Sequence, residues 1–136
     1  MEKVFVDANI VIDLLEKRED FYQEAQELFT LADKNEVQLY VSALTIANAH
    51  YILFKHLKRE AKKVLSKFKV LVEVLPMTDK ILELSLSSDH KDFEDAIQYY
   101  TAIENEMEII ITRNKKDFKE SNIPILTARE FINHYC

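Results

Sequence analysis

Two short apolar runs, at residues 4–6 and 109–111, constrain the fold of this chain most, because each is β-branched or aromatic and is followed at once by polar residues. Brief runs that are apolar throughout are typical of strands buried on both faces of a parallel sheet. Weaker runs at 39–41, 70–75 and 123–126 predict further strands. Parallel strands need crossover connections, so helices should lie between them.

The segments between the predicted strands carry apolar residues at helical spacing, as at Ala25, Leu28 and Phe29. Ser42 is a candidate cap for a helix that runs through residues 48–57, and the Thr-Ala-Arg-Glu sequence at 127–130 is typical of a capping box. Strands that alternate with helices predict an α/β layer fold with a central parallel sheet.

Composition limits the possible functions. With 136 residues, 48% of them hydrophobic, the chain suits one core, and we expect a single domain over residues 1–136. The net charge of -6 would repel a polyanion, so binding to nucleic acid would need local positive charge. Because glycine is absent, Gly-rich phosphate loops are excluded. The only cysteine is Cys136, and no apolar run is long enough for a signal peptide or a membrane span, so we expect a cytoplasmic protein without membrane contact.

Asp7 follows the first predicted strand directly, which places it at the carboxyl end of a parallel sheet, where ligands of such folds usually bind. Its neighbour Asn9 shares this position. Asp7 or Asn9 could instead serve only as the cap of the next helix, residues 10–15, and the motif alone leaves both interpretations open.

A second acidic segment, Asp92-Phe-Glu-Asp95, opens the helix that continues through Ala96 and Ile97. The structural interpretation is strong here, because Asp92 can cap the helix while Glu94 and Asp95 complement the helix dipole. A third polar segment, Thr112 to Phe118, follows the strand at 109–111 and could be a plain loop.

Taken together, the three segments indicate a site. Two follow strands and one opens a helix, so they can converge on one edge of the sheet. Their oxygen ligands suit Mg²⁺ or Mn²⁺ better than zinc. Carboxylates that hold such ions are typical of enzymes that hydrolyse phosphodiesters, and this is the activity that we expect.

The order of these segments also resembles a known family, the PIN domains, and especially the VapC-type toxins of bacterial toxin–antitoxin pairs. The matching segments span nearly the whole chain: VFVDANIVIDLL, VSALTIANAHYIL, DFEDAIQYYTAIEN, IIITRNKKDF and IPILTAREF. The resemblance implies a three-layer α/β/α fold with a central parallel sheet, and a single-stranded RNA endonuclease that uses Mg²⁺ or Mn²⁺ at an acidic quartet. It also implies a cognate antitoxin and a homodimer.

The resemblance assigns roles to individual positions. Asp7 matches the first acid of the family, Asp95 matches the acid before its Asp-Ala helix, and Asn114 with Asp117 matches its TRN-x-x-DF segment. The expected catalytic residues are therefore Asp7, Asp95 and Asp117; the expected metal ligands are these three with Asn114, Asp92 and Asn48; and the expected substrate contacts are Asn9, Thr112, Arg113, Lys115 and Lys116.

Asn48 is a departure from the family pattern, which has a glutamate in the helix after the second strand. An amide oxygen can bind a metal ion, but it adds no negative charge and cannot act as a base. Asp92 could compensate, because residues three apart share a helix face with Asp95. The substitution also leaves open a noncatalytic PIN module that binds RNA or a protein partner.

Two other observations bear on function. The tract from Lys55 to Lys69 contains seven basic residues and a single acid, Glu60. It could steer RNA phosphates, or it could be only a solvated helix face. The aspartate-nucleophile phosphatases also begin with a strand and an aspartate, but their chemistry needs an acid two residues later, where this chain has Asn9.

Overall fold

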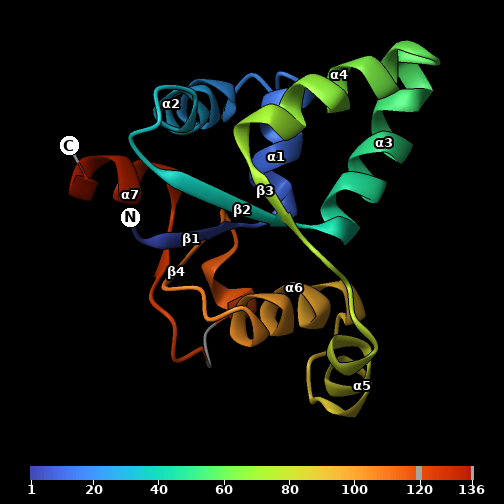
Figure 1. The fold of residues 1–136 in the computed structure, drawn as a ribbon, viewed down its shortest axis with the longest axis vertical. Coiled ribbons are helices and arrows are strands. Elements are labelled where there is room, and N and C mark those ends of the chain that lie inside the picture. Colours follow the sequence, from blue (N-terminus) through green and yellow to red (C-terminus); the bar gives the residue numbers. More distant parts are fainter. Residues whose placement is uncertain (119–120, 136) are drawn as a thin grey trace.

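Five parallel strands form one central sheet in the order β3-β2-β1-β4-β5 in the computed structural model, which describes residues 1–118 and 121–135 (Figure 1). Both neighbours of β1 pair with it in parallel. The outer pairs, β2 with β3 and β4 with β5, are parallel as well. The strands are β1 (Lys3–Val6), β2 (Gln38–Ser42), β3 (Glu73–Leu75), β4 (Ile109–Ile111) and β5 (Ile125–Leu126). The predicted parallel sheet is confirmed.

Helices cover both faces of the sheet, which gives the predicted three layers (Figure 1). One side carries α5 and α6, and the other carries α1, α2 and α7, with α3 and α4 beside them. The helices are α1 (Ala8–Leu15), α2 (Tyr22–Asp33), α3 (Ala43–Leu57), α4 (Glu60–Phe68), α5 (Asp79–Ser87), α6 (Phe93–Glu104) and α7 (Ala128–Tyr135). Short 3₁₀ turns lie at Lys69–Leu71 and Lys115–Phe118.

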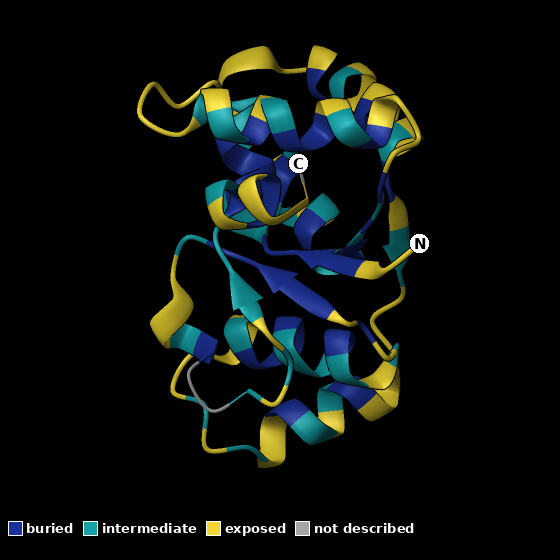
Figure 2. Cartoon of the chain, turned by 90° about the vertical axis from the view of Figure 1, so that its left-hand side faces the viewer, coloured by how far each residue is buried: buried dark blue, intermediate teal, exposed yellow. Residues whose placement is uncertain are grey.

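Alternation along β1 divides the core into two parts, since successive side chains of a strand point to opposite faces. Val4 and Val6 pack into the larger cluster, with residues of α1, α2 and α7. Phe5 packs into the smaller cluster, with Ala102 of α6 and Ile110 of β4. Figure 2 shows the sheet between the two helical layers, with its central strands mostly buried, as expected for sheets of this kind.

The capping signals in the sequence are confirmed. Ser42 Oγ accepts a hydrogen bond of 3.1 Å from the Thr45 amide at the start of α3. At α7, Thr127 and Glu130 form the reciprocal capping box, with Oε1 accepting from Thr127 N at 2.9 Å and Oγ1 accepting from Glu130 N at 3.1 Å.

The strand predicted at 70–75 is only partly correct. Residues Lys69–Leu71 form a 3₁₀ turn, and the strand β3 begins at Glu73. Val70 is 85% exposed, so the apolar run there does not mark a buried strand. β5 is likewise shorter than the predicted strand at 123–126.

The absence of glycine has a visible consequence at the helix ends. Lys17, Asn35, Lys58 and Glu106 adopt positive φ angles of 51°, 60°, 51° and 56° just after α1, α2, α3 and α6. Glycine usually occupies such positions, because a side chain there costs about 1–2 kcal/mol. The rest of the fold therefore carries this strain. In residues 1–118 and 121–135, no helix has the length and apolar character needed to cross a membrane.

Candidate active site

Asp7 is held from several directions at the carboxyl end of β1. Its side chain is buried, at 6% exposure, and caps α1 by accepting a hydrogen bond of 2.8 Å from the Ala8 amide. Its Oδ2 accepts from Thr112 Oγ1 at 2.8 Å, and its Oδ1 accepts from Gln98 Nε2 at 3.1 Å. The capping interpretation is confirmed, and it is compatible with a role in a site, since the cap leaves the carboxylate fixed between Thr112 and Gln98.

Gln98 of α6 is central to this arrangement and was not predicted. It is 3% exposed, and its Nε2 also donates to Thr45 Oγ1 at 2.9 Å. Ser42 Oγ donates in turn to Gln98 Oε1. These bonds join β1, the start of α3 and α6, so the orientation of Asp7 is set by three elements that are distant in sequence.

Thr112 and Asn9 organise the segment that follows β4. Thr112 is fully buried, and its Oγ1 accepts from Asn9 Nδ2 at 3.3 Å and from Asn114 N at 3.1 Å. Asn9 Oδ1 accepts from Arg113 N at 3.4 Å. Asn9 and Thr112, both expected to contact substrate, thus hold this segment against the start of α1.

The three expected catalytic carboxylates, Asp7, Asp95 and Asp117, influence one another through their negative charges. Partial burial, together with the negative charges of Asp92, Asp117, Asp7 and Glu94, raises the pKa of Asp95 to about 7. Burial also raises the pKa of Asp7, against the hydrogen bonds that it accepts, and Asp117 adds to this effect. Charges that affect one another in this way lie close together, and Asp95 and Asp117 also line the same cavity.

Asp92 has the structural role that the sequence indicated. Its Oδ1 accepts from the Asp95 amide at 3.0 Å and caps α6. This cap places the first turn of α6, and with it Asp95, beside the end of β1.

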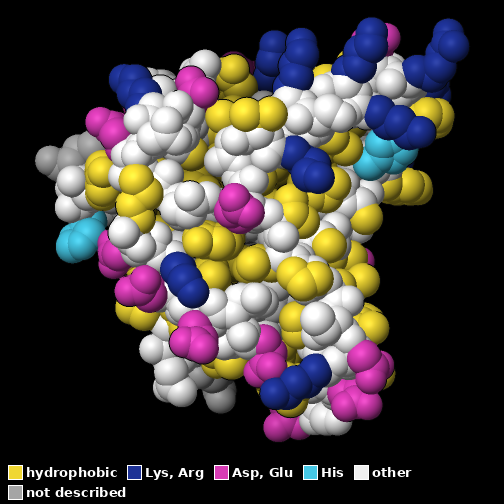
Figure 3. Space-filling model, in the orientation of Figure 1, with side chains coloured by type: hydrophobic (Ala, Val, Ile, Leu, Met, Phe, Trp, Pro, Cys, Tyr) yellow, Lys and Arg dark blue, Asp and Glu magenta, His cyan; other side chains and the backbone are white. Residues whose placement is uncertain are grey.

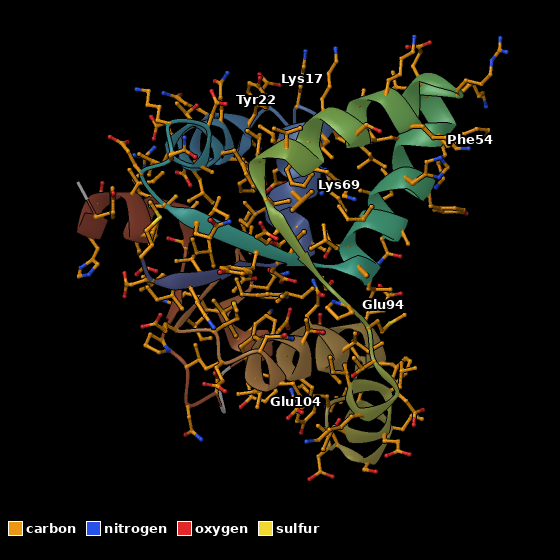
Figure 4. All side chains as sticks on the ribbon, viewed as in Figure 1. Lys17, Tyr22, Phe54, Lys69, Glu94 and Glu104 are labelled. Carbon is orange, nitrogen blue, oxygen red and sulfur yellow. The ribbon has the colours of Figure 1, made fainter. Side chains whose placement is uncertain are left out.

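Asn48 contacts a carboxylate that was not predicted as part of the site. Its Nδ2 donates to Glu94 Oε1 at 2.9 Å, which joins α3 to the first turn of α6. Figure 4 shows Glu94 where the start of α6 approaches the start of α3. The sequence signal was present, since Glu94 precedes Asp95, but it was interpreted only as a complement to the helix dipole.

Two of the three predicted basic contacts are engaged by acids. Arg113 makes two hydrogen bonds to the buried Asp13, at 2.7 and 3.1 Å, and its guanidinium lies 3.9 Å from the centre of the Phe21 ring. Lys115 Nζ lies 3.0 Å from Glu130 Oε1. Lys116, by contrast, lines a cavity that also contains Asp95 and Asp117.

The donor set fits a hard divalent cation. In residues 1–118 and 121–135, no group of three or more His, Cys, Asp or Glu side chains is placed so that it could hold a metal ion by itself. Mg²⁺ rarely uses an all-protein cage, because it keeps several waters and binds through one or two carboxylates and substrate phosphate. Asp7 and Asp95 could supply these carboxylates; burial is the main cause that raises the pKa of each, and neighbouring negative charges add to it.

Comparison with known proteins agrees with this geometry. Residues 3–116 match the PIN domain family. The chain is 28% identical to Ribonuclease VapC1 of Aquifex aeolicus, over 98% of this chain and 96% of that protein. A toxin–antitoxin complex from Klebsiella pneumoniae contains a chain with 28% identity and a TM-score of 0.65, covering 92% of this chain and 97% of that one. VapBC from Salmonella typhimurium, bound to DNA, shares the fold with a TM-score of 0.70 and 20% identity, over 94% and 99% of the two chains.

The chain therefore belongs to the PIN domain family, as its motifs indicated.

Proposed function

We propose that this chain is a divalent-metal-dependent endoribonuclease of the VapC type and the toxin of a toxin–antitoxin pair. The observation that carries the proposal is Asp7, a buried carboxylate that Thr112 and Gln98 orient beside Asp95 and Asp117. Full-length similarity to a ribonuclease supports the choice of RNA as the substrate.

The proposed site residues have different roles. Asp7 and Asp95 would hold Mg²⁺ or Mn²⁺, and Asp117 or Asn114 would hold its water. Asp92 and Asn48 are further candidate ligands. A bound divalent ion supplies an activated water and neutralises charge that develops on the phosphate.

Glu94 joins this proposed acid set. Its carboxylate accepts a hydrogen bond from Asn48, the residue that replaces the glutamate of the family, and it also adds to the negative field at Asp95. We therefore assign to Glu94 the negative charge that Asn48 lacks. Unlike a glutamate at position 48, Glu94 approaches the site from α6.

The partner of the proposed toxin is a cognate antitoxin. The similarity to a chain of a toxin–antitoxin complex at 28% identity supports this assignment. A homodimer and a cytoplasmic location remain predictions from the sequence.

Asn48 also favours a second candidate function, a PIN module that binds RNA without cleaving it. An amide in place of an acid reduces the charge available to hold a cation. Affinity for Mn²⁺ separates the two candidates, because only the nuclease needs the ion.

The test is cleavage of mixed single-stranded RNA by the purified chain with Mg²⁺ or Mn²⁺, compared with the same reaction in EDTA. The proposal predicts cleavage that EDTA stops and added Mn²⁺ restores. Cleavage that continues in EDTA would contradict metal dependence. Absence of both cleavage and Mn²⁺ binding would favour the noncatalytic module.

A further inference from the structure

A cavity of about 720 Å³ opens beside the acidic edge of the sheet. Asp95 and Asp117 line one part of it. The rest of its wall carries two further carboxylates, Asp89 and Asp92, and the aromatic side chains of His90, Tyr99 and Tyr100. The cavity therefore joins the proposed metal centre to an aromatic surface.

The aromatic side chains form one cluster. The ring centres of Tyr99 and Tyr100 are 5.2 Å apart, and His90 lies 5.5 Å from Tyr99 and 5.9 Å from Tyr100. All three are only partly buried. Ring faces of this kind are platforms on which the bases of single-stranded nucleic acids stack.

The loop that carries His90 is tied to the helix before it. Ser88 Oγ donates to Ser85 O at 2.8 Å and accepts from His90 N at 3.3 Å. The position of the histidine is thereby set before any ligand binds, which lowers the entropic cost of binding.

Two lysines also line the cavity. Lys91 follows His90, and Lys116 precedes Asp117. Both are exposed, and neither takes part in an ion pair within residues 1–118 and 121–135. In a chain with a net charge of -6, two exposed ammonium groups beside an aromatic cluster fit a phosphate and its base.

Other candidate surfaces fit RNA less well. A second cavity, of about 490 Å³, contains Arg113 and Arg129, but these side chains pair with Asp13 and with Glu24 and Glu27. Lysines gather over α4 and the far end of α3, at the top of Figure 3, and Lys58 Nζ lies 5.5 Å from the centre of the Phe54 ring. The ring of Tyr51, which is 68% exposed, is partly covered by Lys55 Nζ at 4.8 Å from its centre.

We propose that the cavity beside Asp95 and Asp117 is a nucleotide subsite of the single-stranded RNA substrate. The base flanking the cleaved phosphate stacks on the His90, Tyr99 and Tyr100 cluster, and a neighbouring phosphate contacts Lys91 and Lys116. The subsite rests on the proposed nuclease function and adds to it the surface that receives the substrate.

The experiment measures binding of a short, labelled single-stranded RNA of mixed sequence by fluorescence anisotropy in EDTA at low salt. Tyr100→Leu removes a ring, Tyr100→Phe keeps it, and Tyr22→Leu removes a partly buried ring from α2 on the other face of the sheet. We expect Tyr100→Leu to weaken binding about 5- to 100-fold, and the other two variants to bind as the unmodified chain does.

Lys91→Ala tests the phosphate contact separately. It should lower the slope of log Kd against log salt concentration by about 0.7, while Lys34→Ala, at an exposed position after α2, should leave the slope unchanged. Mn²⁺ affinity, measured by calorimetry, should be unchanged in Tyr100→Leu. If Tyr100→Leu does not fold, His90→Ala replaces it in the same comparison.

The outcomes separate the subsite from the nuclease. If the unmodified chain cleaves RNA while Tyr100→Leu and His90→Ala bind it normally, the subsite is wrong and the proposed function stands. If the unmodified chain neither binds nor cleaves RNA, both fail. Where repulsion by the carboxylates hides binding in EDTA, the same variants are compared by KM during cleavage with Mn²⁺, with the same fold-changes expected.

Discussion

Thr112 and Asp7, which follow the neighbouring strands β4 and β1, are joined by a hydrogen bond of 2.8 Å from the threonine hydroxyl to Oδ2 of the aspartate. The bond is buried, and it lowers the pKa of Asp7 against the effect of burial. It therefore helps to keep a carboxylate charged where the fold would otherwise neutralise it.

Thr112→Val should destabilise the protein by about 1.5–3 kcal/mol near neutral pH, because it removes a hydrogen bond to a buried charge without changing the shape of the side chain. Denaturant unfolding measures the change. The matched control is Thr30→Val, whose hydroxyl donates to Gln26 O on the exposed side of α2 and whose loss should cost less than about 0.5 kcal/mol. Equal costs for the two variants would mean that the bond to Asp7 has no special role.

Asp95→Asn should stabilise the metal-free protein at about pH 8 and abolish cleavage. The pKa of Asp95 in the fold, about 7, lies above its ordinary value of 3.8, so the folded chain binds the proton more tightly than the unfolded chain. The contribution of this group to stability is thus lost as the pH rises from about 4 to about 7, and stays lost above that.

Thermal unfolding in EDTA tests this prediction. Asp95 is partly exposed to solvent, so the expected gain at about pH 8 is only a few degrees in Tm, and it should vanish near about pH 4. A variant that is less stable than the unmodified chain at the higher pH would show that the charge of Asp95 is compensated within the protein.

Glu94→Gln should weaken Mn²⁺ binding about tenfold or less, because it removes one negative charge but keeps the shape of the side chain that contacts Asn48. Asn48→Glu should tighten Mn²⁺ binding, and the double variant should return it close to the value of the unmodified chain. Calorimetric titration of Mn²⁺ measures all three, with Glu83→Gln, an exposed acid on α5, as the control. Unchanged affinity in Glu94→Gln would remove this residue from the site.

Arg113→Met should destabilise the fold by about 2–3 kcal/mol, because it leaves Asp13, which is 1% exposed, without its bidentate partner. The loss should be smaller than the 3–5 kcal/mol that is typical when a buried pair is broken, since Arg18 lies 3.8 Å from the same carboxylate. Equilibrium unfolding gives the value. A stable Arg113→Met variant with weakened RNA binding would instead support the predicted contact with substrate.

Local sequence was a good guide to the fold. The runs at 4–6, 39–41 and 109–111 are strands, because short β-branched segments with polar ends suit a buried parallel sheet. The run at 70–75 was predicted as one strand, although its first two residues belong to a 3₁₀ turn and β3 begins only at Glu73. Apolar composition alone does not show whether a side chain such as Val70 will be covered, since this depends on packing between distant segments.

The residues of the candidate site could be predicted from the sequence where they directly follow a strand. Asp7 and Thr112 follow adjacent strands, so their approach follows from the order of the sheet. Gln98 and Glu94 were missed, because one lies within an apolar helix face and the other beside a more familiar acid. The pairing of Arg113 with Asp13 joins residues a hundred positions apart, and no local pattern reveals it.

The most direct test of the account is the rate of Mn²⁺-dependent cleavage of single-stranded RNA by Asp7→Asn, beside the unmodified chain and Asp33→Asn, which alters an exposed acid at the end of α2. The account predicts that Asp7→Asn folds but does not cleave, while Asp33→Asn cleaves at the normal rate. Cleavage by Asp7→Asn at the rate of the unmodified chain would contradict the assignment of Asp7 as the centre of the active site.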